Sequence, residues 1–266
     1  MCAVRAIPVP PLPKRIDTGV RAPQMAGLSA VAVLPCETAP TRRLAVNILR
    51  TEPLAETMAH HHGELDTTLY VVRGTMAFHC GAGLRAGVSV RAGEFCFIEP
   101  HAVHAEHNPD AGEYSLGITA RDTPGAFLFP CDAPGESPQR NGILVVPPGA
   151  APVDTTPAGA TAADTALAGL APLSAHHVRA RQVALDRVTV SAGGRFIPAA
   201  PTRGETALTV LSGGARLREQ DSPAVLEGGS GTWWYIEPGT GWSLENVRND
   251  KPAELLLIRS AGRSPD

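Results

Sequence analysis

The chain has 266 residues, a formal net charge of −3 at pH 7 and nine histidines. This length exceeds that of a usual single domain and suits two small domains of about 85 to 90 residues each. The charge is nearly balanced and no basic block interrupts the sequence, which argues against nucleic acid or an anionic membrane as a partner. We therefore expect a small-molecule substrate.

The first forty residues form the first expected segment, a proline-rich arm over residues 1–40. Its run PVPPLP (8–13) cannot form a central strand because proline lacks the backbone donor. The arm also lacks the continuous apolar stretch of a secretory signal, and no later run approaches transmembrane length. The five cysteines form no CxxC pair, which fits reduced thiols. A cytoplasmic location is the expectation.

Short apolar runs then follow one another along the chain, each bounded by Gly or Pro. Their length and their β-branched and aromatic members are typical of strands. We expect an all-β fold built from LAVNILR (44–50), TLYVVRG (68–74), EFCFIEP (94–100), ALTVLSG (207–213), TWWYIEP (232–238) and AELLLIRS (253–260). Between the two halves, residues 126–175 are rich in Ala, Pro, Gly and Thr and predict a linker, with one short helix near residues 162–170.

Two histidine clusters lie beside these strands, at residues 60–62 and at positions 101, 104 and 107. Side chains alternate along a strand, so His60 and His62 share one face while His61 points to the other. Two imidazoles from one strand and His104 from another can bind one metal ion. A carboxylate from Asp66 or Glu64 would complete a mixed nitrogen and oxygen ligand set.

The spacing of these residues resembles the two motifs of the cupin superfamily, G(x)5HxH(x)3-4E(x)6G and G(x)5PxG(x)2H(x)3N. The pair His60-x-His62 and Gly74 match the first motif, and His104 followed by Asn108 matches the end of the second. For the carboxylate we favour Asp66. The resemblance implies a small β-barrel (double-stranded β-helix) that binds one divalent ion, with Fe expected first and Mn, Zn, Ni or Cu as alternatives. It also implies an N-terminal arm laid over the other barrel or over a second subunit.

A second copy of the motif pair follows the first. The glycines Gly74 and Gly213 differ by 139 positions, and the asparagines Asn108 and Asn246 differ by 138. The chain therefore resembles a duplicated cupin, a bicupin, with tandem domains at 41–125 and 176–262. By the same offsets the second copy has lost its histidines, whose places are taken by Ala199, Pro201 and Trp242.

The interior of the second copy is expected to be filled by aromatic packing. All three tryptophans lie near its second motif, and an indole at the lost ligand position would keep the interior dry. The alternative is a stacking platform for a flat ligand, since a small barrel can also hold one small molecule.

For function we favour a metal-dependent dioxygenase of a small carboxylate, enol or diol, because such enzymes are numerous among cupins with this ligand set. Glu106, on the same strand face as His104, is a candidate general base or a group that supports the ligands, and Glu64 is another candidate. Arg73 is a candidate anchor for a substrate carboxylate. The alternatives are a non-catalytic metal-binding or ligand-binding cupin and a cupin isomerase or decarboxylase. We expect a homodimer.

Overall fold

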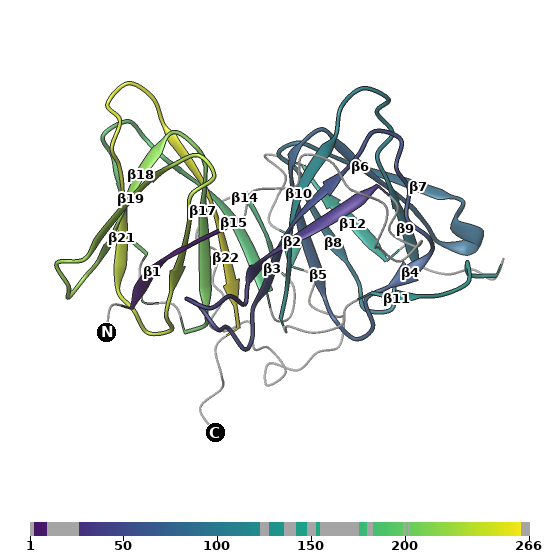
Figure 1. The fold of residues 1–266 in the computed structure, drawn as a ribbon, viewed down its shortest axis with the longest axis horizontal. Helices are drawn as coiled ribbons and strands as arrows, with labels where there is room; N and C mark the ends of the chain where they lie inside the picture. The colour runs from purple at the N-terminus through teal and green to yellow at the C-terminus, as the bar shows by residue number, and fades with distance from the viewer. Residues whose placement is uncertain are drawn as a thin grey trace. The chain divides into compact units, whose positions relative to one another are not determined.

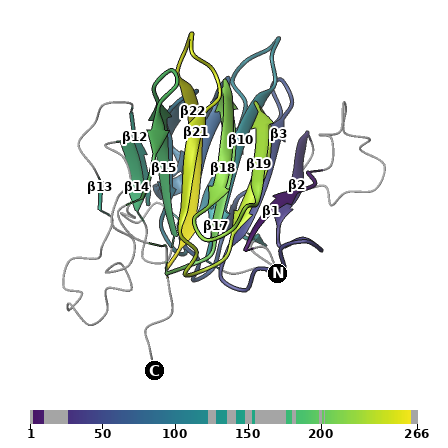
Figure 2. The ribbon, with the colours of Figure 1, turned by 90° about the vertical axis from the view of Figure 1, so that its left-hand side faces the viewer.

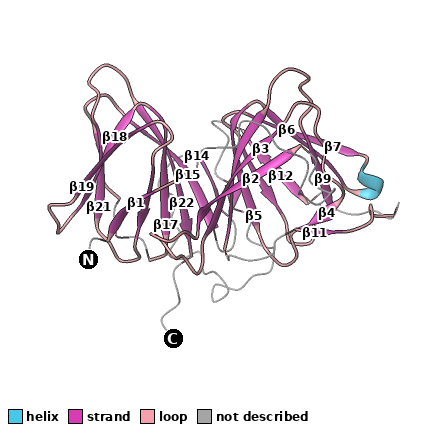
Figure 3. Cartoon of the chain, viewed as in Figure 1, coloured by secondary structure: helices cyan, strands magenta, loops and turns pink. Residues whose placement is uncertain are grey.

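The computed structural model describes residues 3–9, 27–122, 128–135, 142–147, 153–154, 176–179, 183–198, 201 and 203–261. Strands dominate these residues, and their only helical element is the short 3-10 turn η2 (Ala82–Leu84) (Figure 3). The predicted all-β fold is confirmed. Most of the predicted linker, the whole of its predicted helix and most of PVPPLP lie outside the described residues. No helix of the described part has the length and apolar character needed to cross a membrane.

The chain divides into two compact units. The N-terminal unit comprises residues 10–32 and 46–148, and the C-terminal unit comprises residues 1–9, 33–45 and 149–266 (Figure 1). The start of the chain thus belongs to the C-terminal unit, because strand β1 (Val4–Ile7) pairs antiparallel with β20 (Trp233–Ile236).

The N-terminal unit consists of two open sheets. It is not the closed barrel that the sequence led us to expect. The first sheet has the order β12-β8-β5-β10-β3-β2 and the second the order β11-β4-β9-β6-β7. The strands are β2 (Leu28–Leu34), β3 (Ala45–Thr51), β4 (His60–His61), β5 (Thr67–Arg73), β6 (Thr75–Cys80), β7 (Ala86–Arg91), β8 (Phe95–Ile98), β9 (His104–His107), β10 (Ser115–Arg121), β11 (Phe129–Pro130) and β12 (Ile143–Val146).

The C-terminal unit likewise has two open sheets, ordered β1-β20-β17-β22-β15-β14-β13 and β16-β21-β18-β19 (Figure 2). Its remaining strands are β13 (Val153–Asp154), β14 (His176–Arg179), β15 (Val183–Val190), β16 (Arg195–Phe196), β17 (Thr206–Ser212), β18 (Gly214–Glu219), β19 (Val225–Gly229), β21 (Trp242–Asn246) and β22 (Ala253–Ser260).

Each unit buries apolar side chains from both of its sheets in one core. In the N-terminal unit, Leu69 and Val71 of β5 pack in the same cluster as Met76 and Phe78 of β6. Strand β5 is followed directly by β6 because Gly74, with a φ of 72°, makes the tight turn between them. A side chain at this glycine would meet Ser115 in addition to adopting a strained backbone.

The strand order is the same in the two units. The order β8-β5-β10-β3 in one corresponds to β20-β17-β22-β15 in the other, and β4-β9-β6-β7 corresponds to β16-β21-β18-β19. The motif asparagines make equivalent contacts: Asn108 donates to the carbonyl oxygen of Thr51 and Asn246 to that of Val190, both at 3.1 Å. These asparagines therefore fix the loop after β9 or β21 to the neighbouring sheet.

Candidate metal centre

Four side chains that can bind a metal ion come together in the N-terminal unit. His60 lies on β4 opposite His104 of β9, His62 follows β4 directly, and Glu106 is two residues beyond His104. One ligand atom from each lies within 4.8 Å of the others, and all four side chains are buried. The alternation of β9 explains the pairing, because His104 and Glu106 point inward while Ala105 and His107 occupy the other face.

Hydrogen bonds to the backbone orient two of the imidazoles. His60 Nδ1 lies 2.9 Å from the carbonyl oxygen of Met58, and His104 Nδ1 lies 2.8 Å from that of Ala102. A carbonyl oxygen only accepts, so each Nδ1 carries the hydrogen and each Nε2 keeps its lone pair. His104 Nε2 is buried and makes no hydrogen bond within the protein.

An unsatisfied buried nitrogen is costly, whereas a metal ion bound to it would satisfy its lone pair. The residues present therefore fit a divalent ion, and His60, His62, His104 and Glu106 form a group that could hold one.

Burial controls the charges at this site. Burial lowers the pKa of His104 to about 3, with a further contribution from the electrostatic interaction with His60, so the imidazole of His104 is neutral at physiological pH. Burial also raises the pKa of Glu106, an effect that electrostatic interactions with His60 and Arg121 oppose. A bound cation would favour the ionised form of Glu106 for the same electrostatic reason.

Arg121, the last residue of β10, is a site residue that the sequence analysis missed. Its side chain is buried, its Nε donates to Thr67 Oγ1 at 3.0 Å, and its Nη2 lies 3.5 Å from His62 Nε2. Burial lowers the pKa of Arg121 to about 10, and the charge of Glu106 opposes that shift. A charged residue at the end of an apolar run usually reaches solvent, but this one turns toward the metal centre.

The other predicted site residues take different places. Asp66 is buried immediately before β5, and the carboxylate grouped with the three histidines is that of Glu106. Arg73 is exposed and is not brought to the centre, since its guanidinium binds Glu113 at 3.1 Å. Glu64 is exposed as well and pairs with His101 at 2.8 Å.

The remaining histidines of the two clusters lie away from the four ligands, as the alternation predicts. His61 stacks on Phe129, with ring centroids 5.4 Å apart. His107 stacks on His79, with ring centroids 4.5 Å apart, on the outward side of β9 and β6.

The corresponding positions in the C-terminal unit are apolar. Trp242, at the position of His104, is buried in the core cluster together with Leu217, and Leu244 stands at the position of Glu106. Pro201 is exposed, and Ala199 lies outside the described residues. The expectation of a packed interior agrees with this burial of Trp242.

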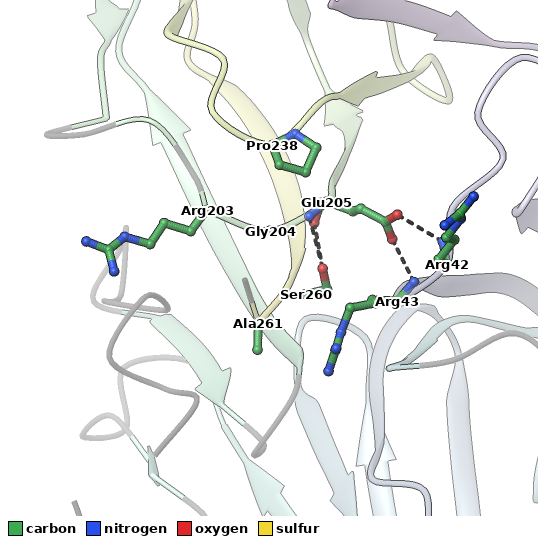
Figure 4. A pocket seen from close by; sticks show the side chains of 8 residues that line it. All are labelled: Arg42, Arg43, Arg203, Gly204, Glu205, Pro238, Ser260 and Ala261. Carbon is green, nitrogen blue, oxygen red and sulfur yellow. Dashed lines mark hydrogen bonds between the residues drawn. The ribbon is translucent and has the colours of Figure 1, made fainter. Parts of the chain in front are cut away.

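The C-terminal unit also contains a cavity of about 380 Å³ that is separate from these core positions. Its single carboxylate, that of Glu205, accepts hydrogen bonds from the backbone N–H groups of Arg42 and Arg43, both at 2.9 Å (Figure 4). The side chain of Arg203 points away from this carboxylate (Figure 4). The cavity is lined by Arg42, Arg43, Arg203, Gly204, Glu205, Pro238, Ser260 and Ala261. This lining contains no histidine or cysteine, so the cavity has no set of metal-binding side chains of its own.

Comparison with known proteins establishes the fold. No family model matches the sequence, and no curated protein matches it. Among solved structures, AerE from Microcystis aeruginosa is 12% identical, with 94% of this chain and 97% of AerE covered at a TM-score of 0.59. A candidate glyoxylate-induced protein from Pseudomonas aeruginosa is 13% identical; the match covers 93% of this chain and 85% of that protein, with a TM-score of 0.64. Oxalate decarboxylase from Bacillus subtilis, a protein with Mn(II) centres, is 16% identical. The match covers 90% of this chain and 74% of the decarboxylase, with a TM-score of 0.60. The chain shares the fold of these proteins, which is consistent with the cupin fold expected from the sequence.

Proposed function

We propose that this protein is a mononuclear metalloenzyme that acts on a small organic acid. The observation that carries the proposal is the buried group of His60, His62, His104 and Glu106, in which a buried imidazole nitrogen keeps its lone pair for an ion. Structural histidines in a core normally have both ring nitrogens hydrogen-bonded or apolar neighbours around them. Three imidazoles that converge with a carboxylate are instead typical of a metal site.

The donor set supports Fe(II) or Mn(II), both of which accept mixed nitrogen and oxygen ligands. A bound ion would supply Lewis-acid or redox chemistry and, with about six coordination positions, would have room for substrate beside four protein ligands. The sequence favours iron, and the fold likeness to a decarboxylase with Mn(II) centres supports manganese. Zn, Ni and Cu are the further alternatives.

In this proposal the side chains of the centre bind the ion and do not transfer protons to or from the substrate. The Nδ1–H groups of His60 and His104 are committed to backbone carbonyls, and their Nε2 atoms face the ion site. Glu106 serves as a ligand rather than as the general base suggested by the sequence, because it lies within the ligand group. Burial of all four residues excludes bulk water from the reacting groups.

Two reaction classes follow from this arrangement. The first is oxygen-dependent cleavage of a small carboxylate, enol or diol, as the sequence resemblance implies. The second is decarboxylation of a small acid, which is supported by a fold likeness to oxalate decarboxylase over 90% of the chain. A non-catalytic role in binding a metal or a small ligand is the alternative to both.

Elemental analysis and paired gas assays test the proposal. The purified protein is loaded with Fe(II) or Mn(II) and assayed for oxygen uptake and for release of carbon dioxide over a panel of small acids and diols. Oxygen uptake supports the dioxygenase, and carbon dioxide without net oxygen uptake supports the decarboxylase. Replacing His104 by alanine removes one ligand and should abolish stoichiometric metal and both activities. Full occupancy in this variant would refute the metal site, and tight metal without turnover would favour a binding protein.

We also propose that the two units arose by duplication and that the C-terminal unit is the copy without metal. Their common strand order and the equivalent contacts of Asn108 and Asn246 support this. A homodimer remains part of the proposal, and the molar mass in solution tests it.

A further inference from the structure

The cavity of the C-terminal unit is basic. Arg42, Arg43 and Arg203 line it together with a single carboxylate, that of Glu205. Arginine stays protonated at physiological pH, so the positive formal charges of the lining outnumber the negative one. A concave surface with such an excess of one sign raises the local concentration of oppositely charged ligands. The cavity therefore favours an anion.

The main chain, and not a guanidinium, holds the carboxylate of the cavity. One oxygen of Glu205 accepts a hydrogen bond from the backbone N–H of Arg42 and the other accepts one from that of Arg43, both at 2.9 Å (Figure 4). A second acid, Glu237, adjoins the lining in the chain and forms an ion pair with Arg5. The backbone at positions 42 and 43 is thus fixed to Glu205, and their side chains start from a defined place.

Two guanidinium groups of the lining lie apart from each other. Arg203 extends to one side of Glu205 and Arg42 to the other side (Figure 4). Within the part of the chain that the structure describes, neither of these two guanidinium groups takes part in an ion pair. A compact ion would contact one of them, whereas a ligand with an anionic group at each end can contact both.

The size and the floor of the cavity suit a ligand of several carbon atoms. Its volume of about 380 Å³ lies within the range of about 300 to 1,000 Å³ that small-molecule sites span. Its floor is well fixed, because the backbone N–H of Glu205 donates to Ser260 Oγ at 3.0 Å. Gly204 lies so close to β22 that a Cβ would overlap the carbonyl oxygen of Ser260. The exposed arginines surround this fixed floor.

We propose that this cavity binds a small dicarboxylate, with one carboxylate at Arg203 and the other at Arg42. A planar guanidinium can bind a carboxylate through two parallel hydrogen bonds, and the charge of Arg43 adds to the attraction. The site lies in the C-terminal unit, whereas the four metal ligands belong to the N-terminal unit. The proposal is therefore independent of the function proposed for the metal centre.

Calorimetry with matched probes tests the site in the full chain. The probes are succinate, glutarate and adipate, each with its monomethyl ester, which keeps the length of the acid but carries one charge. The best diacid should bind at least about tenfold more tightly than its ester. His104→Ala removes a ligand of the metal centre and should keep this preference, which separates the cavity from carboxylate binding at a metal ion.

Arg42→Gln and Arg203→Gln test the two anchors separately. Each variant should bind the diacid about tenfold more weakly, so that the diacid and its ester bind alike. Arg248→Gln is the matched control, because Arg248 is an exposed arginine of the same unit that is paired with Asp250 at 2.8 Å and lies outside the lining. This control should keep the wild-type preference, and an unchanged unfolding temperature shows that each variant is folded.

Four results would overturn the proposal. They are equal binding of diacid and ester by the wild-type protein, an unchanged preference in either anchor variant, an equal loss in Arg248→Gln, and loss of the preference in His104→Ala. Inorganic phosphate that binds as tightly as the best diacid would show a site for a compact ion and would also contradict the dicarboxylate. If an anchor variant does not fold, the probe pairs on the wild-type protein and on His104→Ala decide.

Discussion

Single hydrogen bonds decide which atoms of the centre are available to an ion. Because Met58 and Ala102 accept the Nδ1–H groups of His60 and His104, both rings turn their Nε2 atoms inward. The backbone near each histidine therefore sets the tautomer before any ion is present. This preorganisation depends on main-chain groups, so substitution of neighbouring side chains should leave it intact.

The carboxylate ligand gives the first prediction at this scale. Glu106→Gln keeps the shape of the side chain but removes the charge that binds the ion, so metal affinity should fall by at least about 10- to 100-fold. Asp66→Asn should have a smaller effect, because Asp66 is not among the grouped ligand atoms. Competition with a chelator measures both. The opposite ranking would restore Asp66 as the ligand.

The sequence located most of this centre but not all of it. Alternation along a strand correctly placed His60, His62 and His104 together, and it put Glu106 on the face of His104. The motif count assigned the carboxylate to Asp66, whereas the structure groups Glu106 with the histidines, because spacing along one motif does not show which carboxylate a second strand brings near. Arg121 was missed because its burial depends on contacts with Thr67 and His62, more than fifty residues away in the chain.

Among the elements, strands with long apolar runs were predictable, and very short ones were not. The runs at 68–74, 207–213 and 253–260 all form strands, because a short, continuous apolar run between turn residues predicts a buried strand locally. The strands β4, β11 and β16 have two residues each, too few for any periodic signal. Strand β1 likewise has no local sequence signal that predicts it, because its strand conformation depends on pairing with the distant strand β20.

Strand β21 carries the prediction for the C-terminal core. Trp242 packs against Phe196, with ring centroids 5.9 Å apart, and is only 3% exposed. Trp242→Ala should therefore lower the free energy of unfolding by roughly 3 to 5 kcal/mol, and Trp242→Phe by less. Denaturant titration measures the loss, and metal content should not change. A variant with unchanged stability but weaker binding of a small flat ligand would show that the indole is a binding platform.

For the whole molecule, the two units differ in their response to metal. All three tryptophans belong to the C-terminal unit, whereas the four metal ligands belong to the N-terminal unit. An ion at about 100 times its dissociation constant should stabilise the unit that binds it by about 2.7 kcal/mol. The calorimetric transition of that unit should therefore move to higher temperature, while the transition seen by tryptophan fluorescence stays in place. Equal shifts in both signals would contradict independent unfolding.

The pairing of β1 with β20 has a consequence for how the protein is made. Val4–Ile7 leaves the ribosome well before its partner Trp233–Ile236, which is synthesised about 230 residues later. At roughly 5 to 20 residues per second, that interval is on the order of 10 to 50 s. The last residue of the N-terminal unit, at position 148, is synthesised before β20 within this interval. Strand β1 therefore cannot join its sheet until β20 has been synthesised, although β1 precedes every other strand of that sheet in the sequence.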